Sequence, residues 1–421
     1  MTFELISKWA SPLLAALDAT LTPAGRARLD ALTPRKTYAY MAHTYLRLIP
    51  GGDQRRHLWD RISPKVVDQL RAGAADLVVD TSIETIFLPN SDAHADFAAI
   101  YGKLSDLGVS PERVILASSN LSAGRVHAGV VRDLGVKTPM RLWSSDFAMA
   151  YCADVLESDP AIQAQMAPQS RPKSPGKSDA SLKHFLFLNR KIKPHRVTAL
   201  AVLASRVGLD KAHVSFIGDG REAERASFEA SLRRRAITYA TPGDLQFPEQ
   251  TVAEIMARFP ILLPDSRGHD TAMAYARHSL EGGFYDSSFL SLVSETTFGA
   301  DESLFITEKT LKPLYWRHPF IVLGDPGTLA RLRDLGFRTF APVIDEGYDA
   351  VTQPAARMTA ILDEVTRIGR FDQVQIARAR QALAEAMEHN LNHLRSGFRQ
   401  RCGEMFLDSW EHVTWSAANP S

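Results

Sequence analysis

The sequence predicts an α/β fold with two Rossmann-like domains, and three observations support this expectation. Short apolar runs alternate with helix-like stretches, which is typical of parallel sheets whose strands are connected by helices. This alternation occurs twice, on either side of a segment rich in proline and serine. The chain has 421 residues, which exceeds the usual size of one hydrophobic core. We therefore expect two domains.

The boundary between the domains is predicted at residues 157–181. This segment holds four prolines and several serines but almost no large apolar residue, which is typical of a linker. It separates an N-terminal α/β domain, residues 1–156, from a second α/β domain, residues 182–350. Residues 351–421 have helical periodicity, and we expect them to form helices that pack across the domains.

In the N-terminal domain, the apolar pattern predicts that residues 2–71 are mostly helical. Apolar runs then predict buried strands, separated by an amphipathic helix that ends before Gly108. The expected strands are residues 75–80, 114–118 and 140–143, and the expected helix is residues 92–107.

The second domain repeats this alternation. It is expected to begin with the strongly apolar strand 184–188, followed by a helix over residues 195–206. The later elements predicted by the same pattern are strands 214–218, 289–293 and 320–323 and a charged helix over residues 221–235.

Composition and short patterns exclude several classes of protein. A net charge of +1 provides no broad basic surface for nucleic acid. The two cysteines, Cys152 and Cys402, lie far apart, and neither HExxH nor a D-x-D triplet occurs, so no dedicated metal site is expected. Residues 1–17 lack a signal-peptide pattern, and no apolar run is long enough for a transmembrane helix. We expect a cytoplasmic protein, and peripheral membrane association stays open.

The loop after the first strand of the second domain is the best candidate for phosphate binding. Its sequence, Leu-Asn-Arg-Lys-Ile-Lys-Pro-His-Arg, leaves a strand and opens a helix. Backbone amides at a helix start bind anions, and nearby cations add charge for phosphate oxygens. The alternative is a solvated basic loop. The candidate residues are Asn189, Arg190, His195 and Arg196.

The sequence Phe305-Ile306-Thr307-Glu308-Lys309 is the second candidate. Thr307 is a good N-cap and Glu308 complements a helix dipole, so capping alone explains two of these residues. It does not explain Lys309 in a first turn, nor Pro313, which removes a backbone bond inside the helix. Such local violations are typical of functional sites, and a carboxylate beside a lysine suits a ligand with both hydroxyls and phosphates.

Two further glutamates lie at predicted strand ends. Glu295 follows strand 289–293, and a buried carboxylate there needs a partner, either an arginine of the fold or a ligand hydroxyl. Glu84 follows strand 75–80 and could act as the general base for an acceptor hydroxyl if the domains face each other across a cleft. The alternative for Glu84 is a surface loop.

These motifs together resemble the donor-binding half of α1,3-fucosyltransferases. The similar elements are Ser294-Glu295-Thr296, the Thr-Glu-Lys box at 305–309, the strand 319–322, and Asn189 with Arg196. The pattern also resembles a broad group of uncharacterised bacterial and phage glycosyltransferase-like proteins. The sequence departs from the fucosyltransferase pattern at Phe305, where the family has tyrosine, and at Thr296, where it has asparagine, so GDP-fucose need not be the donor.

The resemblance implies a GT-B-like fold of two facing Rossmann-like domains and metal-independent, inverting sugar transfer. A nucleotide-sugar would be the donor substrate in the second domain, no other cofactor would be needed, and the N-terminal domain would take a saccharide or protein acceptor. Glu308 would hold sugar or ribose hydroxyls, and Lys309 with Arg196 or Arg190 would hold the diphosphate. The catalytic candidates are then Glu84 and Glu308. The alternatives are a nucleotide-sugar epimerase of the same fold and a non-catalytic sugar- or nucleotide-binding protein.

Overall fold

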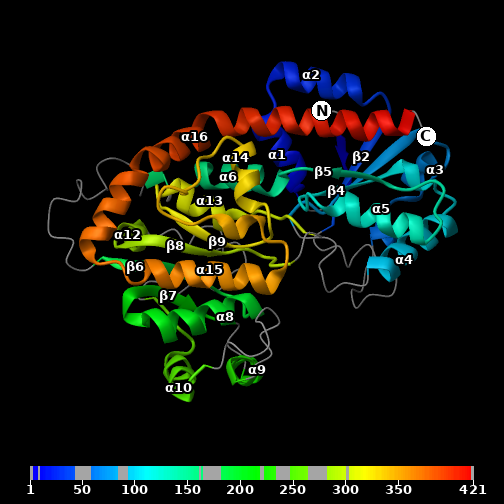
Figure 1. Ribbon diagram of the computed structural model, residues 1–421. Coiled ribbons are helices and arrows are strands. Elements are labelled where there is room, and N and C mark those ends of the chain that lie inside the picture. The colour runs from blue at the N-terminus through cyan, green and yellow to red at the C-terminus, as the bar shows by residue number, and fades with distance from the viewer. Residues whose placement is uncertain are drawn as a thin grey trace. The chain divides into compact units, whose positions relative to one another are not determined.

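The computed structural model describes residues 3–7, 10–42, 58–83, 93–160, 163–164, 182–218, 222–233, 247–263, 282–299 and 303–418. The chain divides into two compact units, each with its own parallel sheet (Figure 1). Unit 1 comprises Met1–Asp154, Asp301–Ile306 and Ser396–Ser421, and unit 2 comprises Val155–Ala300 and Thr307–Arg395. Two separate parallel sheets surrounded by helices confirm the predicted α/β class.

The sheet of unit 1 has five parallel strands in the order β1-β2-β3-β4-β5. They are β1 (Phe3–Leu5), β2 (Lys36–Met41), β3 (Ala75–Asp80), β4 (Val114–Ser118) and β5 (Arg141–Ser144). The three later strands lie at or close to their predicted positions. β3 and β4 are buried along their whole length, as strands covered on both faces must be, whereas β5 alternates between buried and half-buried residues.

The prediction that residues 2–71 are mostly helical is wrong in part, because β1 and β2 lie there. β2 has the sequence Lys-Thr-Tyr-Ala-Tyr-Met, which is rich in the β-branched and aromatic residues that favour strands. It stands at the start of a longer apolar stretch that also fits a helical period, and short apolar runs of this kind cannot be assigned by periodicity alone.

Three helices of unit 1 begin with the same local signal, a capping hydroxyl followed by proline. The side chains of Ser11, Thr22 and Ser63 each accept a hydrogen bond from a backbone N–H in the first turn. The helices of this unit are α1 (Pro12–Thr20), α2 (Pro23–Leu32), α3 (Pro64–Arg71), α4 (Ala93–Asp106), α5 (Ala123–Asp133) and the first part of α6 (Phe147–Ser158), with short 3₁₀ turns at Leu58–Asp60 and Pro111–Arg113.

The long helix α16 (Gln373–Ala418) supplies part of the core of unit 1 through its second half, which begins at Ser396. Trp410 packs on Phe3 with ring centroids 5.5 Å apart and on Trp143 at 4.5 Å, and Phe406 packs on Phe147 at 4.8 Å. Such aromatic pairs bury large apolar areas. The earlier part of α16, up to Arg395, belongs to unit 2.

The sheet of unit 2 has four parallel strands in the order β7-β6-β8-β9. They are β6 (Lys183–Asn189), β7 (Ala212–Phe216), β8 (Ser288–Ser294) and β9 (Phe320–Leu323), close to their predicted positions. From β6 the chain continues to one side of the sheet, and from β8 it continues to the other. The strand order therefore reverses between β6 and β8, which is the point where parallel α/β sheets bind ligands beyond their carboxyl ends.

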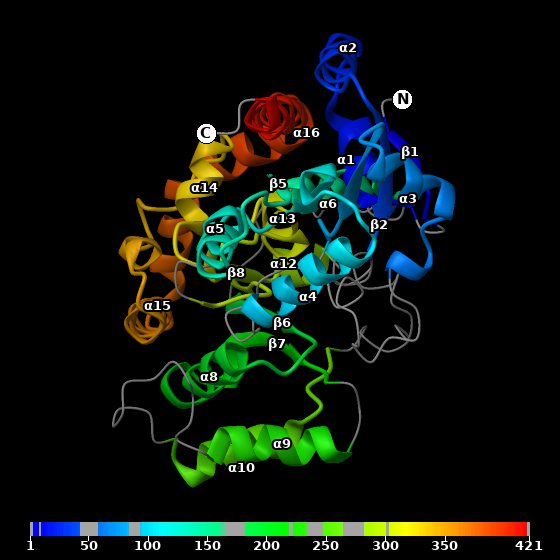
Figure 2. The same cartoon turned by 90° about the vertical axis from the view of Figure 1, so that its right-hand side faces the viewer.

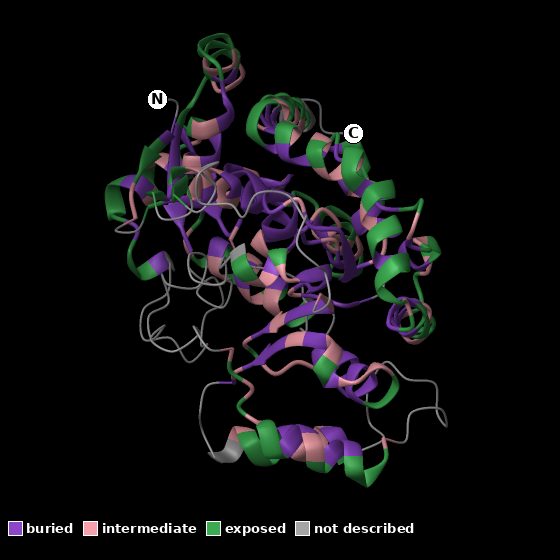
Figure 3. Cartoon of the chain, turned by 90° about the vertical axis from the view of Figure 1, so that its left-hand side faces the viewer, coloured by how far each residue is buried: buried purple, intermediate pink, exposed green. Residues whose placement is uncertain are grey.

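Helices surround the buried strands of unit 2, which Figure 3 shows in purple beneath the green exposed faces of the helices. α9 and α10 pack with α8 and lie outside the sheet (Figure 2). The helices are α8 (Pro194–Val202), α9 (Glu222–Arg233), α10 (Glu249–Arg258), α12 (Gly282–Asp286), α13 (Glu308–Tyr315), α14 (Thr328–Asp334), α15 (Pro354–Ile368) and the first part of α16, with short helical turns at Leu203–Val207, Leu209–Lys211 and Gly347–Ala350.

In the part of the chain that the structure describes, no helix combines the length and the apolar character needed to cross a membrane. The predicted linker 157–181 lies mostly outside the described residues, and α6 reaches Ser158 at its start.

Candidate functional site

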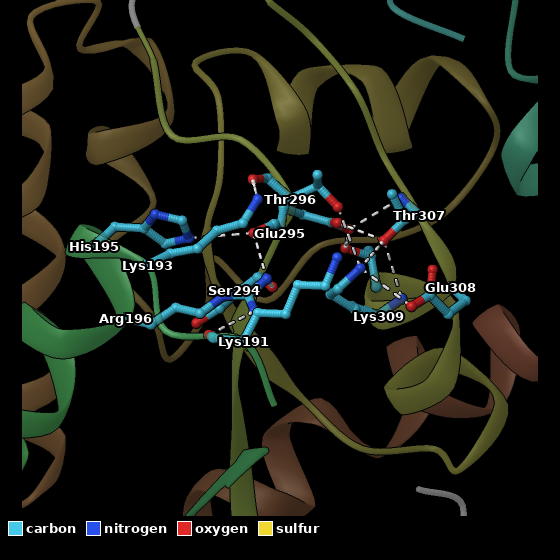
Figure 4. A network of polar contacts seen from close by, with 11 residues as sticks. Lys191, Lys193, His195, Arg196, Ser294, Glu295, Thr296, Thr307, Glu308 and Lys309 are labelled. Atoms are coloured by element: carbon cyan, nitrogen blue, oxygen red, sulfur yellow. Dashed lines mark hydrogen bonds and ion pairs between the residues drawn. The ribbon is translucent and has the colours of Figure 1, made fainter. Parts of the chain in front are cut away.

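The two motifs of the second domain meet at the carboxyl edge of the unit 2 sheet. The loop after β6 leads into α8, and the chain after β8 leads to α13. Figure 4 shows side chains from the start of α8 approaching the end of β8 from one side and side chains from the start of α13 approaching it from the other. Both motifs therefore lie beside the point where the strand order reverses.

Glu295 connects the end of β8 to the start of α13. Its side chain is buried, with an exposed fraction of 1%. Oε1 accepts hydrogen bonds from the backbone N–H of Thr307 at 3.1 Å and from Thr310 Oγ1 at 2.6 Å, and Oε2 accepts one from Thr307 Oγ1 at 2.6 Å. The partner that a buried carboxylate needs is thus supplied within the chain by two threonines.

Thr307 and Lys309 form the next layer of this network. Thr307 is the N-cap of α13, as predicted, and its Oγ1 accepts a hydrogen bond from the backbone N–H of Lys309 at 3.4 Å. The Lys309 ammonium donates to Thr307 Oγ1 at 2.9 Å, to Thr296 Oγ1 at 3.3 Å and to Glu308 Oε1 at 3.1 Å. Three oxygens therefore compensate a cation that is unfavourable in the first turn of a helix.

Glu308 and Lys309 remain accessible, with side chains exposed by 26% and 28%. Pro313 lies inside α13, as the sequence predicts. The helix therefore begins with a partly exposed carboxylate and ammonium, 3.1 Å apart, on a backbone that Glu295 holds in place.

The basic loop after β6 is bonded to the end of β8. Lys193 Nζ donates to the carbonyl oxygen of Thr296 at 2.5 Å. His195 Nε2 lies 3.2 Å from the carbonyl oxygen of Glu295, and Arg196 Nη2 donates to the same oxygen at 3.1 Å and to that of Ser294 at 3.4 Å. These contacts bring two cations of the basic loop, Lys193 and Arg196, and their neighbour His195 to the end of one strand.

The charges at this edge follow from burial and from close neighbours. Burial opposes ionisation of Glu308, but the ammonium groups of Lys309 and Lys312 outweigh it and lower the pKa of Glu308 to about 2. Burial lowers the pKa of Arg196 to about 10, partly opposed by Glu295 and Glu308. At neutral pH the site therefore presents an anionic Glu308 and a cationic Arg196.

His195 is neutral at the pH where these groups are charged. Burial lowers its pKa well below the ordinary value, and the nearby Arg196 and Lys193 lower it further. The ring stacks on Phe298 with centroids 5.7 Å apart. His195 thus lies inside the basic cluster without adding to its charge.

A second buried histidine of unit 2 gives a measurable pH dependence of stability. His318 lies 2.8 Å from Ser291 Oγ through Nδ1 and 3.0 Å from the Ser288 carbonyl through Nε2, and burial lowers its pKa to about 3. Unfolded His318 takes up a proton below pH 6.5, whereas folded His318 does not, so stability present at pH 7.5 is lost on acidification. We expect this residue alone to cost about 2 kcal/mol between pH 7.5 and 5.

The measurement is urea unfolding at pH 7.5 and pH 5 for the wild type and His318→Asn. The variant should lose about 2 kcal/mol less than the wild type over this interval. An equal loss in both proteins would show that His318 does not carry this pH dependence.

The other predicted residues occupy different positions. Asn189 ends β6 and is buried, and Arg190 is half-buried, with its carbonyl oxygen accepting a hydrogen bond from Gly218 N at 2.8 Å. Phe305 is buried, with an exposed fraction of 3%. Glu84, the predicted general base, lies outside the described residues.

Four residues at this edge were not predicted as site residues from the sequence: Lys193, Ser294, Thr296 and Thr310. Thr310 could have been found from its spacing, because residues three apart share a helix face, so Thr310 and Thr307 can reach one carboxylate. Within the described ranges, no group of three or more histidine, cysteine, aspartate or glutamate side chains is arranged to hold a metal ion.

No protein-family model matches the chain, and no curated protein is similar to it in sequence. Several solved structures have a similar course of the backbone. One is an α,α-trehalose-phosphate synthase (UDP-forming) from Burkholderia vietnamiensis, with 11% identity, a TM-score of 0.43, and coverage of 97% of this chain and 78% of that one. The α,α-trehalose 6-phosphate synthase from Burkholderia multivorans has 10% identity, a TM-score of 0.41, and coverage of 96% and 75%. A glycosyltransferase from Rickettsia africae has 8% identity, a TM-score of 0.34, and covers 97% of both chains.

Proposed function

We propose that the protein is a glycosyltransferase that binds a nucleotide-sugar at the carboxyl edge of the unit 2 sheet. The observation that carries this proposal is the Glu295 network, which fixes Glu308 and Lys309 at the start of α13. The same strand end binds the cations Lys193 and Arg196 of the loop after β6. A nucleotide-sugar needs this combination, because it carries two phosphates beside several hydroxyls.

Each group then has a role set by its charge. Anionic Glu308 accepts hydrogen bonds from hydroxyls of the sugar or ribose. Lys309 and Arg196 bind the diphosphate, and their charge stabilises it as it leaves. Arg190, at the start of the same loop, is a further candidate for the phosphates.

The proposed reaction is a single displacement. The acceptor hydroxyl oxygen bonds to the anomeric carbon as the bond from that carbon to the phosphate oxygen breaks, and the electron pair leaves with the nucleoside diphosphate. A general base, for which Glu84 is our candidate, takes the hydroxyl proton. The product is inverted at the anomeric carbon. Since lysine and arginine neutralise the leaving group, the reaction requires no divalent metal.

The acceptor is proposed to be a saccharide or a protein hydroxyl that binds on the side of unit 1. The resemblance of residues 305–309 to the Thr-Glu-Lys box of α1,3-fucosyltransferases makes GDP-fucose the first donor to test. Phe305 lacks the hydroxyl of the family's tyrosine, so other nucleotide-sugars are tested in parallel with GDP-fucose.

A thermal-shift screen across GDP-, UDP-, CMP- and dTDP-sugars tests this function. One donor should raise the melting temperature, because a ligand present at a hundred times its dissociation constant adds about 2.7 kcal/mol of stability. That donor, incubated with an acceptor, should yield a glycosylated product and free nucleotide, and the transfer should persist in EDTA.

Three results would contradict parts of this proposal. Conversion of the donor in the absence of an acceptor would indicate an epimerase. Loss of transfer in EDTA that manganese or magnesium restores would reject charge neutralisation by side chains alone. No stabilisation by any nucleotide-sugar would reject the donor site itself.

A further inference from the structure

Two buried polar side chains end the neighbouring strands β6 and β8 without a hydrogen-bond partner among the described residues. They are Asn189 and Ser294, with exposed fractions of 4% and 3%. Both polar atoms of the Asn189 amide and the hydroxyl of Ser294 lack a partner, and so does Nε of the adjacent Arg196. Leu186 and Ser291 are paired in register, so Asn189 and Ser294 stand at corresponding positions of the two strands.

Unpaired groups of this kind are unusual inside a protein, because a buried polar atom without a partner is destabilising. The other serines of β8 show the ordinary arrangement. Ser288 Oγ donates to the carbonyl oxygen of Phe284 at 2.6 Å, and Ser291 Oγ lies 2.8 Å from His318 Nδ1. Ser294 is as buried as these two, yet it lacks such a contact.

The location of the unpaired groups indicates what they bind. They lie at the carboxyl edge between β6 and β8, where the strand order reverses and where ligands of parallel sheets bind. Figure 4 shows Ser294 beside Arg196 at the end of β8, with Lys193 and Lys309 close by. The surrounding charge is predominantly positive, which favours an anionic ligand.

We propose that Asn189 and Ser294 bind the diphosphate of the donor together with a hydroxyl next to it. The Ser294 hydroxyl and Arg196 Nε donate to phosphate oxygens. The Asn189 amide nitrogen donates to a phosphate oxygen, and its carbonyl oxygen accepts from a ribose or sugar hydroxyl. This inference rests on the proposed function and adds that the two side chains are left unpaired in the free protein because their partner is the ligand.

If Asn189 and Ser294 bind the ligand, substituting them should change stability and binding in opposite directions. Ser294→Ala and Asn189→Leu remove unpaired buried groups, so the free variants should melt at or above the wild-type temperature. Their affinity for the nucleoside diphosphate that binds the wild type best should fall about tenfold or more, because bonds to a charged phosphate are lost. Ser291→Ala is the matched control on the same strand: it should melt lower and bind like the wild type.

The measurements are thermal melting of the free variants and calorimetric titration with GDP, UDP, CDP, dTDP and inorganic pyrophosphate. Wild-type affinity in both variants, alongside weakened binding by Lys309→Ala, would overturn this inference and leave the proposed function standing. Lower melting temperatures of both variants would show that the Asn189 and Ser294 side chains have partners in the free protein. That result would also overturn this inference. Binding of none of these compounds to the wild type would reject the proposed function and this inference with it.

Discussion

Replacing Glu295 with alanine is expected to lower the free energy of unfolding by about 3–5 kcal/mol and to abolish tight nucleotide binding. The carboxylate accepts three hydrogen bonds, from the Thr307 backbone, the Thr307 hydroxyl and the Thr310 hydroxyl. Alanine would leave these donors buried and unpaired and would open a cavity between β8 and α13. The start of α13 would then no longer hold Lys309 and Glu308 in place.

Glu295→Gln separates the charge of this side chain from its shape. Glutamine keeps the volume and one carbonyl oxygen, but its NH₂ group faces a donor where the carboxylate had an acceptor. We expect a smaller loss, about 1–3 kcal/mol. Urea unfolding and titration with nucleoside diphosphates measure the two effects.

Glu385 provides the control, because it is a surface glutamate that forms an ion pair with Arg338. Its side chain is exposed by 86%, so Glu385→Ala should cost less than about 1 kcal/mol and leave binding unchanged. A Glu295→Ala protein as stable as the Glu385→Ala protein would show that the carboxylate does not hold α13.

Most strands could be predicted from the sequence because parallel strands buried on both faces are short, continuous apolar runs. Residues 114–118 and 289–293 are examples, and both are strands in the structure. β1 could not be predicted in this way, because it has only three residues, of which two are exposed, and gives no pattern. Its position is determined by pairing with β2, a contact between distant residues.

The start of the candidate site could be predicted from local conflicts in the sequence. Lys309 and Pro313 are both unfavourable where they stand in α13, and the structure shows the oxygens that compensate the lysine. The hydrogen bonds of Glu295 join residues that are further apart in the sequence, since Thr307 and Thr310 follow Glu295 by 12 and 15 residues. Glu295 and Thr307 were nevertheless both candidates from the sequence.

The pairing of β6 with β8 could not be predicted from the sequence. About a hundred residues separate Leu186 from its partner Ser291, and nothing in either strand specifies the register. The side-by-side positions of Asn189 and Ser294 follow only from that register. Their lack of hydrogen bonds likewise depends on tertiary structure, so the sequence indicates Asn189 as a candidate but gives no reason to select Ser294.

Replacing Lys309 with alanine is expected to weaken the binding of nucleoside diphosphates by about 10- to 100-fold. A charge-assisted hydrogen bond to phosphate contributes roughly 1.5–3 kcal/mol, and the Lys309 ammonium is partly exposed at the edge where the donor is proposed to bind. Calorimetric titration of the wild type and Lys309→Ala with the diphosphate selected by the donor screen measures the change.

Lys65 is the matched control, because it has the same place in its helix as Lys309. Each is the second helical residue after a capping hydroxyl, Ser63 for α3 and Thr307 for α13. Lys65 is exposed in unit 1, so Lys65→Ala should bind like the wild type. If Lys309→Ala also binds like the wild type, Lys309 does not bind phosphate. Its ammonium would then contact only the three oxygens of Thr296, Thr307 and Glu308. The donor site would then lie elsewhere, because no other position of α13 presents an accessible ammonium beside Glu308.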